Sequence, residues 1–246
     1  MMKPVLWLIF ASAVVVTAIF TPKYLIAQRP GKSKTSLKYK MICSSMFVIA
    51  GFSAAAIAEN TSAYAVFMLI GLLLSWAGDF LLHVKDTKQF FMFGLLAFLT
   101  AHILYLLAYQ NAAKHIFGGK FLGPVQIILV PLLFLVSVVY CYIKKINVKS
   151  LMLLPVAIYI LVLSTMFVKA SGLGVLHIRA GGALWEGAVL IVGSFFFFCS
   201  DATLGILMIN KKTKSFPMKC FNIITYFSGQ LMLASSILFF QTQAIT

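Results

Sequence analysis

Charged residues are scarce in this chain, and acidic ones most of all. Asp, Glu, Lys and Arg together make up 10% of its 246 residues, and only five residues are acidic. A soluble domain carries about a quarter charged residues. Instead, 62% of the residues are hydrophobic, mean hydropathy is +1.02, and apolar runs of about twenty residues recur along the sequence. This composition excludes a soluble globular domain and predicts an all-α, polytopic transmembrane bundle.

Several motifs of soluble enzymes are also missing. No G-x-S-x-G elbow surrounds Ser75 or Ser200, so a serine hydrolase is not expected. The histidines scatter toward both sides of the predicted spans, with His83 and His115 at span ends and His177 in a predicted loop, which disfavours a three-histidine zinc site. We therefore expect no serine nucleophile and no three-histidine zinc site.

The cysteines show no loop spacing typical of disulfides. All lie in or beside apolar spans, which predicts small apolar packing residues rather than disulfides or metal ligands. They are Cys43, Cys141, Cys199 and Cys220.

Basic residues are the one charged class in excess, with a net charge of +15. They occupy the short connections between apolar runs and lack the clustered face with interleaved aromatics that nucleic acid requires. This excludes a nucleic-acid partner and indicates the positive-inside pattern of membrane proteins. The composition therefore predicts membrane lipids as partners. It does not determine the oligomeric state.

The apolar runs predict eight spans within a single integral membrane domain, residues 1–246. The first is expected to be a retained helix, since no small-x-small cleavage site precedes Thr21-Pro22-Lys23. Arg29-Pro30-Gly31 is expected to interrupt the helix, and residues 170–182 to form a rather long connection. The spans are roughly 5–21, 38–58, 62–83, 90–109, 122–142, 149–169, 183–208 and 218–241.

The lysines and arginines predict the orientation. The odd-numbered connections contain Lys23, Arg29, Lys32, Lys34, Lys38, Lys40, Lys85, Lys88, Lys144, Lys145, Lys149, Lys211, Lys212, Lys214 and Lys219, whereas the other side has Lys3, Lys114, Lys120, Lys169 and Arg179. This bias places the odd connections in the cytoplasm and both termini on the far side of a membrane, expected to be the cell membrane.

Two acids lie inside apolar spans, where hydrocarbon cannot solvate them. Asp79 precedes Lys85 by six residues and Asp201 precedes Lys211 by ten, so they lie about 9 Å and about 15 Å from the inner connections. Both then fall in the cytoplasmic half of the bilayer. Glu186 is about 22 Å from Asp201 along the same helix and cannot join them.

The surroundings of the two acids resemble each other. Residues 77–82, AGDFLL, and 199–204, CSDATL, share a small-Asp-x-x-Leu pattern near the inner end of the third and seventh spans. The following spans each hold mid-membrane polar groups: His102 and Tyr105 in the fourth, Tyr226 and Gln230 in the eighth. This spacing predicts a parallel 4+4 repeat that brings the acids together.

Two carboxylates in one water-filled cavity support two kinds of chemistry. Different environments can keep one protonated as a general acid and the other ionised as a general base. The same pair could also bind protons or cations in a transporter or scramblase. Each Asp could instead form an interhelical hydrogen bond to a partner such as Ser75, His102, Tyr226 or Gln230.

Four segments together resemble the YhhN family of membrane proteins, the lysoplasmalogenases. They are GLLLSWAGDFLL (71–82), FGLLAFLTAHILY (93–105), SDATL (200–204) and TYFSGQ (225–230). The resemblance covers all eight spans and is most specific in the third, fourth, seventh and eighth.

The resemblance implies an enzyme that hydrolyses the vinyl ether bond of a lysoplasmalogen to a fatty aldehyde and a glycerophospho-head group, with no metal and no organic cofactor. The charge bias predicts that its site opens to the cytoplasmic leaflet. Asp79 and Asp201 are the expected catalytic pair, by analogy with the two carboxylates of glycosidases. The residues expected to bind or orient water and substrate are Ser75, His102, Tyr105, Ser200, Tyr226 and Gln230. A transporter or scramblase, and a lipid hydrolase acting on an ester or amide, remain alternatives.

Overall fold

The computed structural model describes residues 2–29, 31–85, 87–113, 122–143, 150–209 and 215–240. These residues form eight α-helices and a final 3₁₀ turn, with no strand among them. The helices are α1 (Met2–Gln28), α2 (Lys34–Ile57), α3 (Ala63–Val84), α4 (Lys88–Ala113), α5 (Pro124–Ile143), α6 (Ser150–Arg179), α7 (Leu184–Ile209) and α8 (Phe216–Ser235), followed by η2 (Ser236–Leu238). The predicted all-α fold is confirmed.

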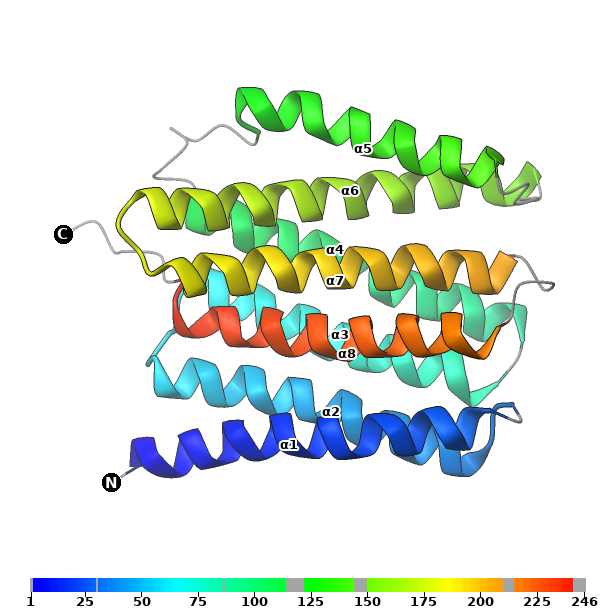
Figure 1. Cartoon of the computed structure of the whole chain (residues 1–246), viewed down its shortest axis with the longest axis horizontal. Helices are drawn as coiled ribbons and strands as arrows, with labels where there is room; N and C mark the ends of the chain where they lie inside the picture. The colour runs from blue at the N-terminus through cyan, green and yellow to red at the C-terminus, as the bar shows by residue number, and fades with distance from the viewer. Residues whose placement is uncertain are drawn as a thin grey trace.

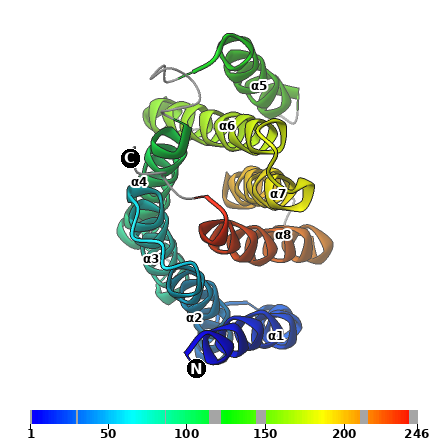
Figure 2. The same cartoon turned by 90° about the vertical axis from the view of Figure 1, so that its left-hand side faces the viewer.

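Six helices form a closed ring, and two lie outside it. Going round the ring, α2 packs on α3, α3 on α4, α4 on α6, α6 on α7, α7 on α8, and α8 back on α2 (Figure 2). Helix α1 packs on α2 and α8, and α5 packs on α6. The helices run antiparallel to their chain neighbours along one long axis, as Figure 1 shows.

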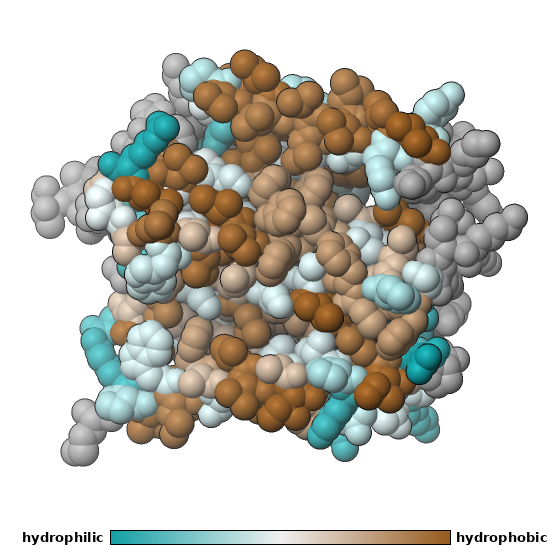
Figure 3. Space-filling model, in the orientation of Figure 1, coloured by the Kyte–Doolittle hydropathy of each residue, from teal (hydrophilic) through white to brown (hydrophobic). Residues whose placement is uncertain are grey.

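Seven of the described helices are long and apolar enough to cross a membrane, while α5 is apolar but contributes a shorter segment, Pro124–Tyr140. Large apolar side chains such as Leu8, Ile128 and Leu154 point outward. In Figure 3 the middle of the visible face is mostly hydrophobic. Hydrophilic residues gather toward the two ends of the helices. Such a surface suits hydrocarbon rather than water.

Helices α1 and α6 run well beyond their predicted ends, at residues 21 and 169. Helix α1 continues through Pro22 and ends at Gln28, just before Arg29-Pro30-Gly31. A proline within a membrane helix is tolerated where neighbouring groups satisfy the freed backbone. Helix α6 continues through residues 170–179, so the long connection predicted there is wrong.

Glycine packing explains the extension of α6. A Cβ on Gly174 would lie 2.7 Å from the backbone oxygen of Gly187 in α7, so the glycine serves close helix packing rather than a loop. His177 therefore lies in a helix and not in the predicted loop. Its Nε2 lies 2.7 Å from Oε2 of Glu186 at the end of the bundle opposite the acids. His115 and the side chain of Cys141 lie outside the described part of the chain.

Glycines also set the distance between α3 and α4. The ring of Tyr105 lies against Gly71, and the ring of Phe98 lies against Gly78, so that a Cβ at either glycine would clash with an aromatic side chain. The two contacts are seven residues apart on both helices, which keeps them on one face of each. They bring α4 close beside Asp79.

The helix contacts follow the pattern of the predicted repeat. The predicted repeat matches α1 with α5, α2 with α6, α3 with α7 and α4 with α8. The contact of α2 with α8 then corresponds to the contact of α6 with α4, and both contacts are present. Among the described residues, the contacts that α8 makes with α1 and α3 have no counterpart in the other half. The 4+4 repeat stays a prediction.

Candidate active site

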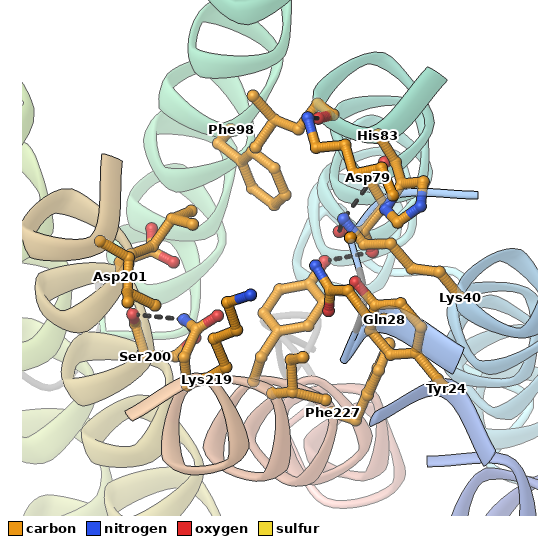
Figure 4. A pocket seen from close by; sticks show the side chains of 18 residues that line it. Tyr24, Gln28, Lys40, Asp79, His83, Phe98, Ser200, Asp201, Lys219 and Phe227 are labelled. Carbon is orange, nitrogen blue, oxygen red and sulfur yellow. Dashed lines mark hydrogen bonds and ion pairs between the residues drawn. The ribbon is translucent and has the colours of Figure 1, made fainter. Parts of the chain in front are cut away.

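The two membrane acids line one cavity of about 280 Å³. It lies at the end of the bundle where α1 joins α2, α3 ends and α8 begins, the right-hand end in Figure 1. Figure 4 shows Asp79 on one wall and Asp201 on the opposite wall. The apolar part of the lining comprises Leu82, Phe98, Leu204, Leu207, Ile223 and Phe227, and the polar part comprises Tyr24, Gln28, Lys32, Lys40, Asp79, His83, Ser200, Asp201, Lys219, Asn222 and Tyr226.

Serine caps begin the helices at this end of the bundle. Ser33 caps α2 in a capping box with Ser36, and Ser215 caps α8, satisfying backbone N–H groups that would otherwise lack partners. The Ser36 hydroxyl also lies 2.9 Å from Nε2 of His83 in the last turn of α3. These bonds connect the helix ends that surround the cavity.

Asp79 is held as a fully bonded carboxylate. Its Oδ1 lies 2.9 Å from Nζ of Lys40 in α2. Its Oδ2 accepts hydrogen bonds from Ser44, at 2.6 Å, and from Tyr226 of α8, at 2.8 Å. The side chain of Asp79 is 3% exposed, so a cation and two hydroxyls replace the water that burial removes.

Asp201 has different partners and no lysine among them. Its Oδ2 accepts a hydrogen bond from Tyr159 of α6 and lies 3.3 Å from Nε2 of His102 in α4. The imidazole stacks on Phe197, with ring centroids 5.0 Å apart and planes 5° apart. Among the described residues, the α4 and α7 backbones do not pack directly, so these side chains fill the space between them.

The contacts of His102 indicate which of its two ring nitrogens carries a hydrogen. Its Nδ1 lies 2.5 Å from the carbonyl oxygen of Phe98, so this nitrogen carries a hydrogen and donates it. In the neutral ring, the Nε2 lone pair then faces Oδ2 of Asp201, and two lone pairs repel each other. Although the pair is not aligned for a hydrogen bond, one shared proton on either group removes that repulsion.

The two acids have equivalent positions in the two halves of the bundle. Asp79 on α3 is contacted from α2 and α8, and Asp201 on α7 is contacted from α6 and α4. Under the predicted repeat, α2 corresponds to α6 and α8 to α4. Under that correspondence, matching helices contact the two acids: Asp79 is contacted by a lysine, a serine and a tyrosine, and Asp201 by a tyrosine and a histidine.

The predicted orienting residues divide into two groups. Tyr226 and Ser200 line the cavity, and His102 contacts Asp201. The others lie in a separate buried cluster: Tyr105 donates to Oε1 of Gln230 at 3.2 Å, and its hydroxyl lies 3.4 Å from that of Ser75. These three do not line the cavity, so any role in orienting substrate would be indirect.

Sequence reasoning missed three residues that contact the acids. Lys40 was counted only as a residue that sets orientation, and Ser44 and Tyr159 were not considered. Lys40 and Ser44 are four residues apart, on one face of α2, and this spacing within an apolar span was a usable signal. No comparable signal marks Tyr159, because it lies among other apolar and aromatic residues.

Two other acidic residues lie away from this site. Glu186 pairs with His177, and Glu59 forms an exposed ion pair with Lys3, 2.9 Å apart. Asp86 lies outside the described part of the chain. Within the described ranges, no three His, Cys, Asp or Glu side chains are grouped so that they could hold a metal ion. Among the described carboxylates, Asp79 and Asp201 alone line the cavity.

Comparison with known proteins gives one curated relative. It is a lysoplasmalogenase homolog from Dictyostelium discoideum, 24% identical over 202 residues that cover 74% of this chain. The chain spans 66% of the length of that relative. No solved structure matches. The model of the YhhN family matches residues 37–237, which include both acids and all of their described partners, and the chain therefore belongs to the YhhN family.

Proposed function

We propose that this protein is an intramembrane hydrolase that cleaves the vinyl ether bond of lysoplasmalogens, with Asp201 as the general acid and Asp79 as the carboxylate that activates water. The observation that carries the proposal is that one cavity is lined by two acids with complementary surroundings. Asp79 is paired with Lys40, while Asp201 lies 3.3 Å from Nε2 of His102, and we propose that these two groups share one proton. The relative described as a lysoplasmalogenase homolog supports the choice of substrate.

The first step is proton transfer to carbon. A vinyl ether accepts a proton at its β-carbon, and the adjacent carbon and oxygen become an oxocarbenium ion. Asp201 donates this proton and becomes a carboxylate, and the tyrosine donor on its Oδ2 stabilises the new charge. Asp79 already carries a negative charge on the facing wall, which stabilises the cation as it forms.

Water then completes the reaction. Water adds to the oxocarbenium carbon and gives a proton to Asp79, forming a neutral hemiacetal. In its collapse, the hemiacetal hydroxyl returns a proton to Asp201, and Asp79 protonates the departing glycerol oxygen. The products are a fatty aldehyde and a glycerophospho-head group, and both acids regain their starting protonation. No metal or redox partner enters this balance.

The shape and lining of the cavity suit a single-chain lipid. Its apolar lining, which includes Phe98, Leu204 and Phe227, can hold the alkenyl chain, while the polar groups lie toward the end of the bundle. That end carries the lysine-rich connections, so the positive-inside pattern puts the entrance in the cytoplasmic leaflet. A lysolipid would enter from that leaflet with its head group at the connections.

Replacing either acid by asparagine tests the proposal. Asp79→Asn and Asp201→Asn keep side-chain volume but remove the base or the acid, so each is expected to lower aldehyde release by a factor of about 10² to 10⁴. The measurement is aldehyde released from an alkenyl lysophospholipid by purified protein in nanodiscs. Glu186→Gln, at the far end of the bundle, is the matched control and should retain activity.

Other outcomes would contradict the proposal in distinct ways. Normal turnover by both Asp variants would exclude the assigned roles. Hydrolysis of ester or amide lysolipids in preference to the vinyl ether would indicate a different bond. Proton or lipid movement across proteoliposomes, lost in the Asp variants and without any hydrolysis, would favour a transporter or scramblase.

A further inference from the structure

A row of buried polar side chains leads from the core of the bundle to Asp79. Ser75 of α3, Tyr105 of α4 and Gln230 of α8 have no exposed surface. Tyr226 is the last member of the row, and its hydroxyl donates to Oδ2 of Asp79 at 2.8 Å. Polar groups buried in a membrane bundle are costly, and they often mark a functional site.

The hydrogens of this row point in one direction. The Tyr226 hydroxyl donates to Asp79, so the Tyr226 oxygen remains available as an acceptor. The Tyr105 hydroxyl donates to Oε1 of Gln230 at 3.2 Å, which leaves the Ser75 hydroxyl, 3.4 Å away, as a donor to the Tyr105 oxygen. Each donor thus points to the next member on the way to Asp79, and donors aligned in this way polarise one another.

Gln230 joins the two parts of the row. It lies one helical turn after Tyr226 on α8, so the two side chains share one face of the helix, and it interacts with the Tyr226 hydroxyl. Because Oε1 of Gln230 is bound by Tyr105, the amide nitrogen Nε2 is the end left for Tyr226. Nε2 is buried and forms no aligned hydrogen bond within the described part of the chain. The Tyr226 oxygen is the acceptor that the row leaves open to it.

Packing fixes the Tyr226 ring, so its hydroxyl hydrogen is the part that can turn. The ring centroid lies 6.0 Å from that of Phe98, with the planes at 76°, and 5.8 Å from that of Phe197. The hydroxyl hydrogen can still point toward Asp79 or away from it. An N–H group of Gln230 on the other side of the oxygen would hold that hydrogen toward Asp79.

We propose that Gln230, anchored by Tyr105, is a positioning residue that keeps Tyr226 a donor to Asp79 throughout the reaction. This inference rests on the proposed function and adds to it two residues that do not line the cavity. Once Asp79 has taken a proton from water, its new O–H group could turn to the Tyr226 oxygen. With the Gln230 amide on that oxygen, the proton faces the cavity instead, where the departing glycerol oxygen needs it.

Tyr105→Phe and Gln230→Met break the row without changing a residue of the cavity lining. Each is expected to lower kcat about tenfold, the effect of one hydrogen bond, and to leave KM for an alkenyl lysophospholipid unchanged. The matched control is Tyr64→Phe, which removes the other buried tyrosine–serine contact, 2.6 Å long, to Ser236 after α8. This control should lower the unfolding midpoint about as much as Tyr105→Phe does, yet retain the kcat of wild type.

Infrared spectroscopy tests the same contact without turnover. The carboxyl-group band of Asp79 is the one missing from Asp79→Asn, and its frequency depends on the hydrogen bonds that the group forms. It should shift in Tyr105→Phe and Gln230→Met and stay in place in Tyr64→Phe.

Three results would overturn the proposal: wild-type kcat in both row variants, an unchanged band in both, or a fall in kcat that Tyr64→Phe shares. A shifted band in a protein that releases no aldehyde would refute the hydrolase and leave the contact of Gln230 with Tyr226 intact. Aldehyde release with neither kcat nor the band changed in the row variants would refute the positioning role alone.

Discussion

At the scale of single residues, the two acids differ through their partners and not through their depth alone. Asp79 has a cation and two hydroxyl donors, whereas Asp201 has a tyrosine and a histidine. Asp79 is paired with a lysine, whereas Asp201 faces Nε2 of a histidine. We base the proposed roles of base and acid on this difference, because sequence alone left the two residues interchangeable.

Lys40→Met should strongly destabilise the protein. Removing Lys40 leaves the charge of Asp79 buried without its cation, a change that costs about 3 to 5 kcal/mol in buried pairs. The double variant Lys40→Met/Asp79→Asn should recover much of this loss, because a neutral amide still accepts from Ser44 and Tyr226. The measurement is the thermal unfolding midpoint in detergent for both variants and wild type.

The chain offers a matched control for this prediction. Lys3 forms an ion pair of the same length with Glu59, but both side chains are exposed, at 62% and 74%. Water screens such pairs, so Lys3→Met should leave the unfolding midpoint unchanged. If Lys40→Met and Lys3→Met lowered the midpoint equally, the buried pair would not have the role given to it here.

At the scale of helices, glycines determine how closely the elements that carry the site can approach. A Cβ on Gly229 of α8 would lie 2.9 Å from both the carbonyl oxygen of Gly193 and the amide nitrogen of Phe197 in α7. Small residues at such positions let helix backbones pack closely, which is a main source of association in a membrane. Tyr226 lies one turn before this contact, so the packing of α7 on α8 also positions a donor to Asp79.

Gly229→Ala should therefore be harmful. The added methyl group meets backbone atoms that cannot rotate away, and the overpacking is expected to cost about 1 to 3 kcal/mol. It should also reduce aldehyde release, because α8 must shift and carry Tyr226 with it. Unfolding midpoints and activity of the variant measure both effects.

Gly205→Ala is the control on the neighbouring helix. Among the described residues, no atom lies within 4 Å of a Cβ built at Gly205. Alanine at this position would restrict a flexible helix residue without causing a clash. It should be neutral or stabilise the protein by about 0.5 to 1 kcal/mol. Equal destabilisation by the two substitutions would mean that close packing at Gly229 is not required.

At the scale of the whole molecule, eight helices return the chain to the side on which it began. Met2 and Leu238 lie at the end of the bundle away from the cavity (Figure 1). The lysine-rich connections lie at the cavity end, which the positive-inside pattern places in the cytoplasm. Both termini are then expected outside.

Reporter fusions test this orientation. In a bacterial host, alkaline phosphatase fused to the C-terminus should be active, and a green fluorescent protein fused there should stay dark, because only the first folds outside the cytoplasm. An epitope inserted after Gly31, in the connection beside the cavity, should be protected from external protease. The opposite pattern would place the cavity entrance in the outer leaflet and contradict the proposed route for the substrate.

The hydropathy pattern was enough to predict the helices and their order, because hydrocarbon requires every spanning segment to satisfy its own backbone. The same pattern misplaced the end of α6. The predicted connection included Gly172 and Gly174, but both glycines pack against other helices. The scarcity of acidic residues likewise identified Asp79 and Asp201, because a charge buried in hydrocarbon is costly unless a partner or a function maintains it. These inferences depend on properties that each segment carries alone.

Only the tertiary structure decided which residues meet. Lys40 and Tyr159 are 39 and 42 residues from the acids they contact, and neither position by itself indicates which acid it meets. The ring of helices brings α2 to α8 and α4 to α6, so each acid is contacted from both halves of the chain. The sequence determined that two costly carboxylates lie in the membrane. Packing between distant helices decided that they share one cavity, and that one faces a lysine and the other a histidine.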